Sequence, residues 1–257
     1  MLKSLKQAFM KNDADNVSPP AIDPSQISEA FVIAVANQKG GTGKTNTTMQ
    51  IAAALCRWNY KVLVIDVDPQ GTAVQWSMVS DKGFPAAVVA LPDSKNLHLK
   101  IAHFGKDYHF ILVDSPPSKE NTATARVLPL AHLVIMPIIP SAPDLWATVG
   151  IKAAIEQAQI VNPYLQSRLL INQVLNRTRL ARDLVEAIRE FGITCFDTQL
   201  GQRTAYRESA ATGLTVFDLD NLEARTEMEH LTSEVLAALA APLMVEAIQS
   251  AATSTES

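Results

Sequence analysis

Residues 37–45 read Asn37-Gln38-Lys39-Gly40-Gly41-Thr42-Gly43-Lys44-Thr45, and this stretch decides how the sequence folds. The apolar run 31–36 precedes it and predicts a buried strand, while residues 47–55 have a helical pattern. A strand, a glycine-rich turn and a helix form the setting of a phosphate-binding loop. The glycines allow backbone N–H groups to turn inward, where they and the helix N-terminus bind polyphosphate.

The residue types in this stretch predict a site for ATP and Mg²⁺. In a loop of this kind Lys44 reaches the β- and γ-phosphates, and the Thr45 hydroxyl is a ligand of Mg²⁺. The backbone that binds the phosphates is predicted to come from Gly40, Gly41, Thr42 and Gly43. The pattern differs from the common phosphate-binding loop, because Gln38 stands where the first glycine is expected and Lys39 precedes the glycine pair.

The run Lys39-Gly40-Gly41-Thr42-Gly43-Lys44-Thr45 resembles the deviant phosphate-binding loop of the ParA/MinD family of ATPases. In that family the early lysine reaches across a dimer to the nucleotide held by the other subunit. The resemblance therefore implies a homodimer with ATP between its subunits. It also implies that Lys39 and Lys44 both belong to the catalytic residues.

Two further apolar runs end in aspartates. Residues 62–65 lead into Asp66 and Asp68, and residues 110–113 lead into Asp114. Ligands of open α/β sheets bind at the carboxyl ends of the strands, so these carboxylates are expected near the phosphate-binding loop. By resemblance, Asp68 positions or activates the attacking water, Asp66 supports Mg²⁺ and its waters, and Asp114 holds Mg²⁺ through water. A single aspartate at a strand end can also be a capping residue.

Strands and helices are predicted to alternate along the rest of the chain. Residues 86–91 form a short apolar stretch before a predicted helix that ends near Gly105, and 131–137 and 169–172 are interpreted as strands. Helices are also expected from Ser141 to about Val161 and from Asn221 to about Ala240. The predicted fold is an α/β P-loop NTPase, with a mostly parallel twisted sheet and helices on both faces. By resemblance Asn172 binds the adenine ring, although asparagine at a strand end is also common in turns.

The predicted domain organisation has three parts. Residues 1–30 are an N-terminal extension and linker, in which Met1 to Lys11 can form a short amphipathic helix with lysines on its polar face. Such a helix can contact a membrane, DNA or a partner, or it can be a frayed end or dock on its own domain. Residues 31–245 are the ATPase domain, and residues 246–257 are a flexible tail.

The composition is that of one globular α/β domain. The chain has 257 residues, of which 47% are hydrophobic and 19% charged, and its net charge is −4. No segment has the ~18 consecutive apolar residues of a membrane helix, and no signal peptide is expected. Cys56 and Cys195 lie far apart in the sequence, so reduced thiols in a cytoplasmic protein are expected rather than a disulfide or metal site.

Arginines concentrate in the last third of the chain and predict sequence-independent DNA binding, because guanidinium groups bind phosphates. ParA-type proteins bind DNA through basic residues in this region when they are dimerised by ATP. An alternative is that these arginines lie on solvated helix faces beside acidic neighbours, and Arg203 can instead serve the nucleotide pocket. The predicted DNA-binding residues are Arg177, Arg179, Arg182, Arg203, Arg207 and Arg225.

The resemblance implies a cytoplasmic, nucleoid-associated ATPase that positions a cargo. A ParB-like or cargo-adaptor partner would stimulate hydrolysis, and the cargo could be a plasmid, a chromosome, a carboxysome or a protein cluster. One alternative is a MinD-like ATPase on a membrane, but residues 226–257 contain no Lys or Arg for a basic membrane helix. Another is a small-molecule ligase or amidase of the same fold, against which stand Lys39 and the run Asp66-Val67-Asp68-Pro69-Gln70.

Overall fold

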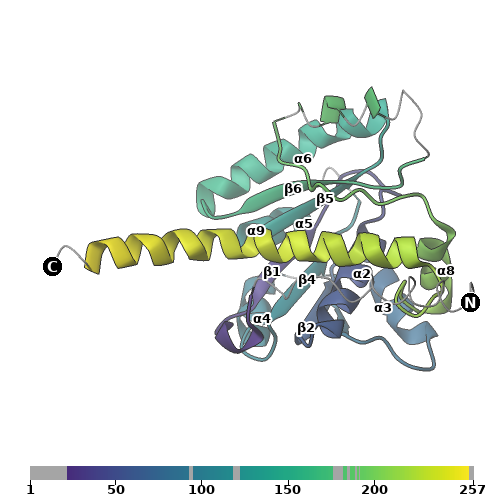
Figure 1. The fold of residues 1–257 in the computed structure, drawn as a ribbon, viewed down its shortest axis with the longest axis horizontal. Helices are drawn as coiled ribbons and strands as arrows, with labels where there is room; N and C mark the ends of the chain where they lie inside the picture. The colour runs from purple at the N-terminus through teal and green to yellow at the C-terminus, as the bar shows by residue number, and fades with distance from the viewer. Residues whose placement is uncertain are drawn as a thin grey trace, which may run out of the picture.

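The computed structural model describes residues 22–92, 95–117, 122–175, 182–183, 186–188, 190 and 192–254. Its centre is a parallel sheet of six strands in the order β3-β2-β4-β1-β5-β6 (Figure 1). In chain order the strands are β1 (Phe31–Val35), β2 (Val62–Asp66), β3 (Ala87–Ala90), β4 (Phe110–Asp114), β5 (Leu133–Ile138) and β6 (Gln166–Ile171). The predicted α/β fold with a parallel sheet is confirmed.

The central strands are the apolar runs that the sequence predicts. Every residue of β2, β4 and β5 is buried, because a parallel sheet covered on both faces has no solvent-facing side. β3 and β6 are the two edges of the sheet. The strand register places Val35 of β1 beside Asp114 of β4, and Asp66 of β2 on the other side of Asp114. The strands thereby bring two predicted site carboxylates to one edge.

Helices cover both faces of the sheet. One face is covered by α2 and α3 together with α8 and α9, and the other by α4, α5 and α6. The short 3₁₀ helices are η1 (Pro24–Gln26) and η2 (Leu128–Leu130). The α-helices are α2 (Lys44–Arg57), α3 (Thr72–Val79), α4 (Leu97–Phe104), α5 (Thr122–Val127), α6 (Ala142–Val161), α8 (Thr204–Thr212) and α9 (Leu222–Ser254).

α9 is the long yellow helix that crosses the molecule in Figure 1. It packs against α2 through an apolar face that includes Met228, Leu231 and Val235, all of them buried. The helix runs to Ser254 and so continues well beyond Ala240, where the sequence pattern predicted its end. Pro242 follows Ala240 and disfavours a helix, but most of the later residues are good helix formers, and the helix continues through them.

Some predictions fall outside the described residues. The N-terminal helix from Met1 to Lys11 is one, and Arg177 and Arg179 are others. The boundaries of the three predicted parts of the chain stay predictions. Among the described residues, no helix combines the length and the apolar character needed to cross a membrane.

Candidate functional site

The loop between β1 and α2 is shaped by glycine. Gly43 has a φ of 91°, and a Cβ atom there would lie 2.3 Å from Asn172 Nδ2. A larger residue would therefore meet both backbone strain and a steric clash. Lys44 begins α2 and is 6% exposed, and its Nζ donates to the carbonyl oxygen of Lys39 at 2.9 Å. Burial lowers the pKa of Lys44, although the nearby carboxylates of Asp114 and Asp68 oppose this shift.

Lys39 extends from the same loop in another direction. Its Nζ lies 2.6 Å from Oδ2 of Asp144, with 39% of the lysine side chain exposed and 1% of the aspartate side chain. Asp144 lies in the first turn of α6, where the Ser141 side chain is the N-cap and accepts a hydrogen bond from the Asp144 N–H. The Asn37 side chain supports the loop by donating to the Pro137 carbonyl and accepting from the Lys39 N–H.

The carboxylates meet at the carboxyl ends of β2 and β4. Asp114 Oδ2 accepts a hydrogen bond of 2.6 Å from the Thr45 hydroxyl, which links β4 to the first turn of α2. Burial is the main cause that raises the pKa of Asp114 to about 7, and Asp66 and Asp68 raise it further, whereas Thr45 and Lys44 lower it. Burial also raises the pKa of Asp66. A buried cluster of carboxylates of this kind is stabilised by a bound cation.

The donor set fits a magnesium ion that is held mainly through phosphate and water. Mg²⁺ is commonly bound by one or two carboxylates together with substrate phosphates and waters. Thr45 and Asp114 supply oxygen atoms beside the phosphate-binding loop, and Asp66 is in register with Asp114 on the next strand. Within the described residues, no group of three or more His, Cys, Asp or Glu side chains is arranged to bind a metal without other ligands.

Asp68 lies one residue beyond the end of the buried run. Its backbone N–H donates to Asp66 Oδ1 at 3.0 Å, and its own Oδ1 accepts from the Gln70 N–H at 2.9 Å. The other Asp66 oxygen, Oδ2, accepts hydrogen bonds from the start of α3, from the backbone N–H groups of Ala73 and Val74. Asp66 therefore orders the turn that carries Asp68, and Asp68 remains half-buried, with its carboxylate available to solvent.

A small pocket of about 110 Å³ opens beside the loop on the side of β6. Asn172 Nδ2 donates to the Thr42 carbonyl, and Gln173 Nε2 donates to the Gly41 carbonyl, each at 2.8 Å. The structure thus shows Asn172 bound to the loop backbone, and its predicted contact with adenine stays a prediction. The pocket is lined by Gly43, Asn46, Asn172, Gln173, Gly201, Gln202, Arg203, Tyr206 and Arg207.

Gln173 is a site residue that the sequence analysis did not identify. Its φ is 54°, a left-handed conformation that is uncommon for residues other than glycine and asparagine. That conformation directs its side chain to the phosphate-binding loop. The only signal in the sequence is its position directly after Asn172 at a predicted strand end.

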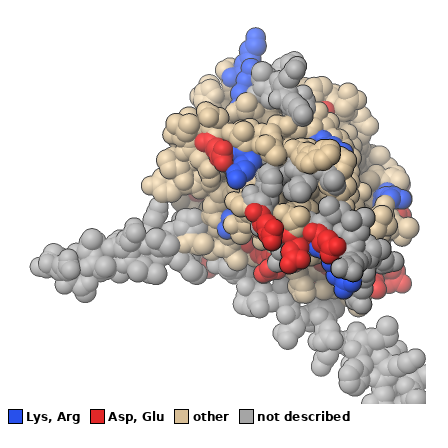
Figure 2. All heavy atoms as spheres, turned by 90° about the horizontal axis from the view of Figure 1, so that it is seen from above, with Lys and Arg blue, Asp and Glu red and all other residues tan. Residues whose placement is uncertain are grey.

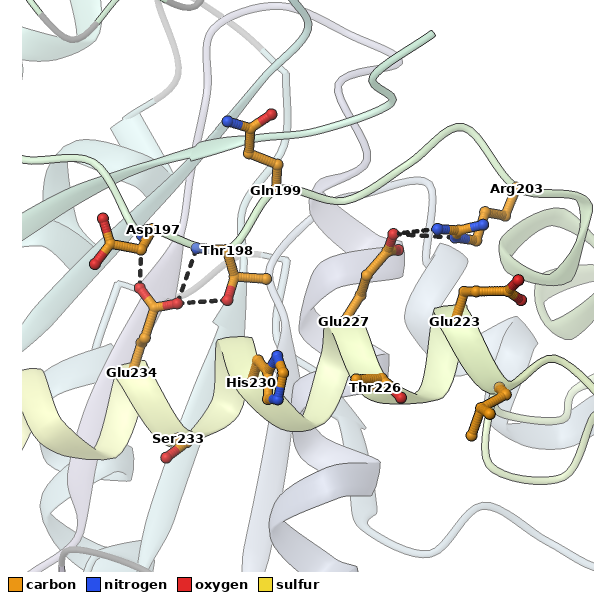
Figure 3. Close-up of a pocket in the computed structure, with 11 residues that line it drawn as sticks. Asp197, Thr198, Gln199, Arg203, Glu223, Thr226, Glu227, His230, Ser233 and Glu234 are labelled. Carbon is orange, nitrogen blue, oxygen red and sulfur yellow. Dashed lines mark hydrogen bonds and ion pairs between the residues drawn. The ribbon is translucent and has the colours of Figure 1, made fainter. Parts of the chain in front are cut away.

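The predicted DNA-binding arginines differ in their surroundings. The Arg203 guanidinium forms an ion pair with Glu227 of α9, with 2.6 Å between Nη2 and Oε1 (Figure 3). Arg225 is half-buried and donates to the Leu219 carbonyl. Arg182 and Arg207 are exposed. Of the predicted DNA-binding arginines that the structure describes, these last two are the most accessible for a DNA phosphate.

Arg203 also lines the pocket beside the phosphate-binding loop. This location matches the alternative that the sequence left open for Arg203, a role at the nucleotide. On the face that Figure 2 shows, the described Lys and Arg side chains lie apart from one another, with Asp and Glu among them. A single continuous basic patch is therefore absent from the described part of that face.

The chain is similar to proteins that position or segregate cellular cargo. It is 32% identical over 214 residues to the maintenance of carboxysome distribution protein A of Halothiobacillus neapolitanus. The aligned region covers 81% of this chain and 98% of that protein. It is 28% identical to the chromosome-partitioning ATPase Soj of Thermus thermophilus, and the aligned region covers 72% of this chain and 86% of Soj.

The fold is also similar to a solved structure. The ATP complex of a Cyanothece McdA variant superposes with a TM-score of 0.70, at 14% identity, and covers 82% of this chain and 97% of that one. Residues 33–216 match the model of the CobQ/CobB/MinD/ParA nucleotide binding domain, and this range includes the loop, the three aspartates and Asn172. The chain belongs to the CobQ/CobB/MinD/ParA nucleotide-binding family.

Proposed function

We propose that this protein is an ATPase that dimerises with ATP, binds DNA without sequence preference and positions a cargo on the nucleoid. A partner protein bound to the cargo stimulates hydrolysis and thereby releases the dimer from DNA. Such a cycle is a switch between two states that differ in their affinity for DNA. The protein works in the cytoplasm, in association with the nucleoid.

The observation that carries this proposal is the divergence of the two loop lysines. Lys44 is nearly buried and contacts the loop itself, whereas Lys39 is partly exposed and contacts Asp144 on α6. The Lys39 amine therefore does not contact the loop that binds the phosphates of its own subunit, and it is exposed enough to exchange Asp144 for a phosphate of a second subunit. The location of Lys39 supports a role at a neighbouring subunit, which its sequence context also predicts.

The residues around the loop support hydrolysis of ATP. Lys44 and the loop N–H groups bind the phosphates, and Asp68 orients the attacking water. Thr45 and Asp114 would hold Mg²⁺, which would supply positive charge to the phosphate oxygens during the reaction. Asp66 holds the turn that carries Asp68 in place through hydrogen bonds to its backbone and to the start of α3. In this proposal the buried side chains of Lys44, Asp66 and Asp114 bind or position, and the half-buried Asp68 takes part in the chemical step.

The proposed cargo is a large cytoplasmic assembly, and a carboxysome or a chromosome are the two that the relatives suggest. The relative from Halothiobacillus is named for carboxysome distribution, and Soj for chromosome partitioning. DNA binding is assigned to the exposed arginines Arg182 and Arg207, together with Arg177 and Arg179. A few arginine–phosphate contacts are enough for weak, salt-sensitive and sequence-independent binding.

An experiment with three nucleotide states tests the proposal. The protein is mixed with two unrelated DNA duplexes of equal length, without nucleotide, with ADP and with ATP, and the mobility of the DNA is measured. We expect a shift of both duplexes with ATP alone, and loss of the shift at moderate salt. Binding of similar strength in all three states, or a strong preference for one duplex, contradicts the proposal.

A further inference from the structure

A groove of about 810 Å³ runs between α9 and the segment 197–203 that precedes α8. Figure 3 shows side chains from both elements pointing into it. One face of α9 lines it with polar side chains, together with Leu222 at one end. Four carboxylates line it beside a single guanidinium, that of Arg203; they belong to Asp197, Glu223, Glu227 and Glu234.

Two of the four carboxylates hold the wall of the groove in place. Glu234 accepts hydrogen bonds from the backbone N–H groups of Asp197 and Thr198, at 2.7 and 2.9 Å. Glu227 accepts from Arg203, from the Gly201 N–H and from the Tyr206 hydroxyl. The wall is thus formed before anything docks, so that docking has a smaller entropic cost.

The other two carboxylates face solvent. Asp197 and Glu223 are exposed, and their side chains accept no hydrogen bond from the residues that the structure describes. Leu222 at the end of the groove is 57% exposed, which is high for a large apolar side chain. The accessible surface of the groove therefore combines two solvent-facing carboxylates, of which Glu223 also interacts electrostatically with Arg203, with one apolar contact.

The groove shares its wall with the nucleotide side of the molecule. Arg203 lines both the groove and the small pocket beside the phosphate-binding loop. Gly201 and Tyr206 line that pocket as well, and both donate hydrogen bonds to Glu227. A ligand that competes with Arg203 for Glu227 must therefore disturb the lining of the pocket.

We infer that this groove docks a cationic segment of a partner protein, and that Glu227 couples the docking to nucleotide binding. Charge complementarity selects the occupant, because lysine or arginine side chains match the free carboxylates and an apolar neighbour matches Leu222. The same charges repel nucleic acid. The inference rests on the proposed function only in taking the occupant to be the partner that stimulates hydrolysis.

The docking is tested by fluorescence anisotropy of a short labelled peptide of alternating lysine and leucine. Its copy with glutamate in place of lysine is the negative probe, and no nucleotide is present. We expect the lysine peptide to bind and the glutamate peptide not to bind. Asp197→Asn with Glu223→Gln should weaken binding about tenfold, because two contacting charges are lost. The control is Asp81→Asn with Asp107→Asn, which makes the same change of charge at exposed sites away from the groove.

The coupling is tested by titrating a fluorescent ATP analogue with and without saturating lysine peptide. We expect the peptide to change the affinity for the analogue, and the analogue to change the affinity for the peptide by the same factor. Glu227→Gln should abolish this mutual effect, because a neutral amide no longer holds Arg203 as a carboxylate does. An unchanged affinity for the analogue in the wild-type protein overturns the coupling.

Equal peptide binding by the groove variant and its control overturns the docking site. A full-length variant with Lys3→Glu, Lys6→Glu and Lys11→Glu checks whether the protein's own N-terminal segment is the occupant. If this variant binds the peptide about tenfold more tightly, the groove holds that segment and the partner assignment is wrong. Failure of ATP hydrolysis in the wild-type protein would instead count against the proposed function, since the anisotropy measurement requires no nucleotide.

Discussion

Lys39 and Asp144 form an ion pair of 2.6 Å between the phosphate-binding loop and the first turn of α6. The aspartate side chain is almost completely buried, whereas the lysine side chain is partly exposed. The Ser141 side chain also donates to the Asp144 carboxylate, which fixes the position of the carboxylate. In this arrangement the lysine that is predicted to act across the dimer is bound within its own subunit, and it must leave Asp144 before it can reach a second nucleotide.

Replacement of Asp144 by asparagine should therefore favour the dimer. An ion pair with an exposed partner contributes up to about 1 kcal/mol, and a symmetric dimer releases one such pair in each subunit. The loss of both pairs should therefore lower the protein concentration needed for ATP-dependent dimerisation by up to about 30-fold. Light scattering across a concentration series measures this shift. Glu156→Gln, an exposed change on the same helix, is the control. If Asp144→Asn dimerises only at or above the concentration that the control variant needs, the ion pair with Asp144 does not restrain Lys39.

Asp68→Ala should separate binding from hydrolysis. Because Asp68 is proposed to orient the attacking water, the variant should bind ATP and dimerise while hydrolysis falls by about 100-fold. A phosphate-release assay beside a nucleotide-binding titration checks both properties. Asp81→Ala, at an exposed site before β3, should hydrolyse at the wild-type rate. A comparable loss of ATP affinity in Asp68→Ala would show that Asp68 serves ground-state binding.

Arg207 and Arg203 should differ in their effects on DNA. Arg207 is exposed on α8, so Arg207→Ala should weaken DNA binding uniformly across sequences and reduce the slope of the salt dependence by about one. Arg203 is held by Glu227 and lines the pocket beside the phosphate-binding loop, so Arg203→Ala should also weaken ATP binding. Salt titrations of DNA affinity and a nucleotide titration distinguish the two variants. Equal loss of ATP binding in both would contradict this assignment.

Stability should fall at alkaline pH because of Cys56. Burial raises the pKa of its thiol from 9.0 to about 11, which means that the folded state favours the neutral thiol. Below pH 9 the thiol is protonated in the folded and the unfolded state, and its contribution to the free energy of unfolding is fully present. As the pH rises toward 11, the unfolded state loses the proton first, so this contribution is lost. Urea unfolding between pH 8 and 11 should show that the free energy of unfolding decreases with pH, and Cys56→Ala should make this decrease less steep. The same decrease in both proteins contradicts the prediction.

Much of the fold can be predicted from local patterns. The strands β1, β2, β4 and β5 are continuous apolar runs, and such runs have few alternatives to a buried parallel sheet. The loop residues and Asp114 could also be placed, because the carboxyl ends of parallel strands meet at one edge. The match of residues 33–216 to the family confirms the recognition that the loop suggested.

The remaining features depend on contacts between distant parts of the chain. Lys39 and Asp144 are 105 residues apart, and no local pattern connects them. The ion pair of Arg203 with Glu227 likewise joins a loop to a later helix. Gln173 was missed because its role depends on a left-handed backbone conformation, which its residue type does not favour. The spacing of apolar residues in the sequence predicts helices and strands, whereas these long-range contacts depend on tertiary packing.

The most direct test of the account is the size of the Lys39→Ala variant in the presence of ATP. Light scattering of the wild-type protein, Lys39→Ala and Lys44→Ala is combined with a nucleotide-binding titration and a phosphate-release assay. We expect a wild-type dimer with ATP, no ATP binding by Lys44→Ala, and a Lys39→Ala variant that binds ATP yet stays monomeric and does not hydrolyse it. If Lys39→Ala forms the same dimer and hydrolyses ATP at the wild-type rate, Lys39 has no role across a subunit interface and the two-subunit switch is contradicted.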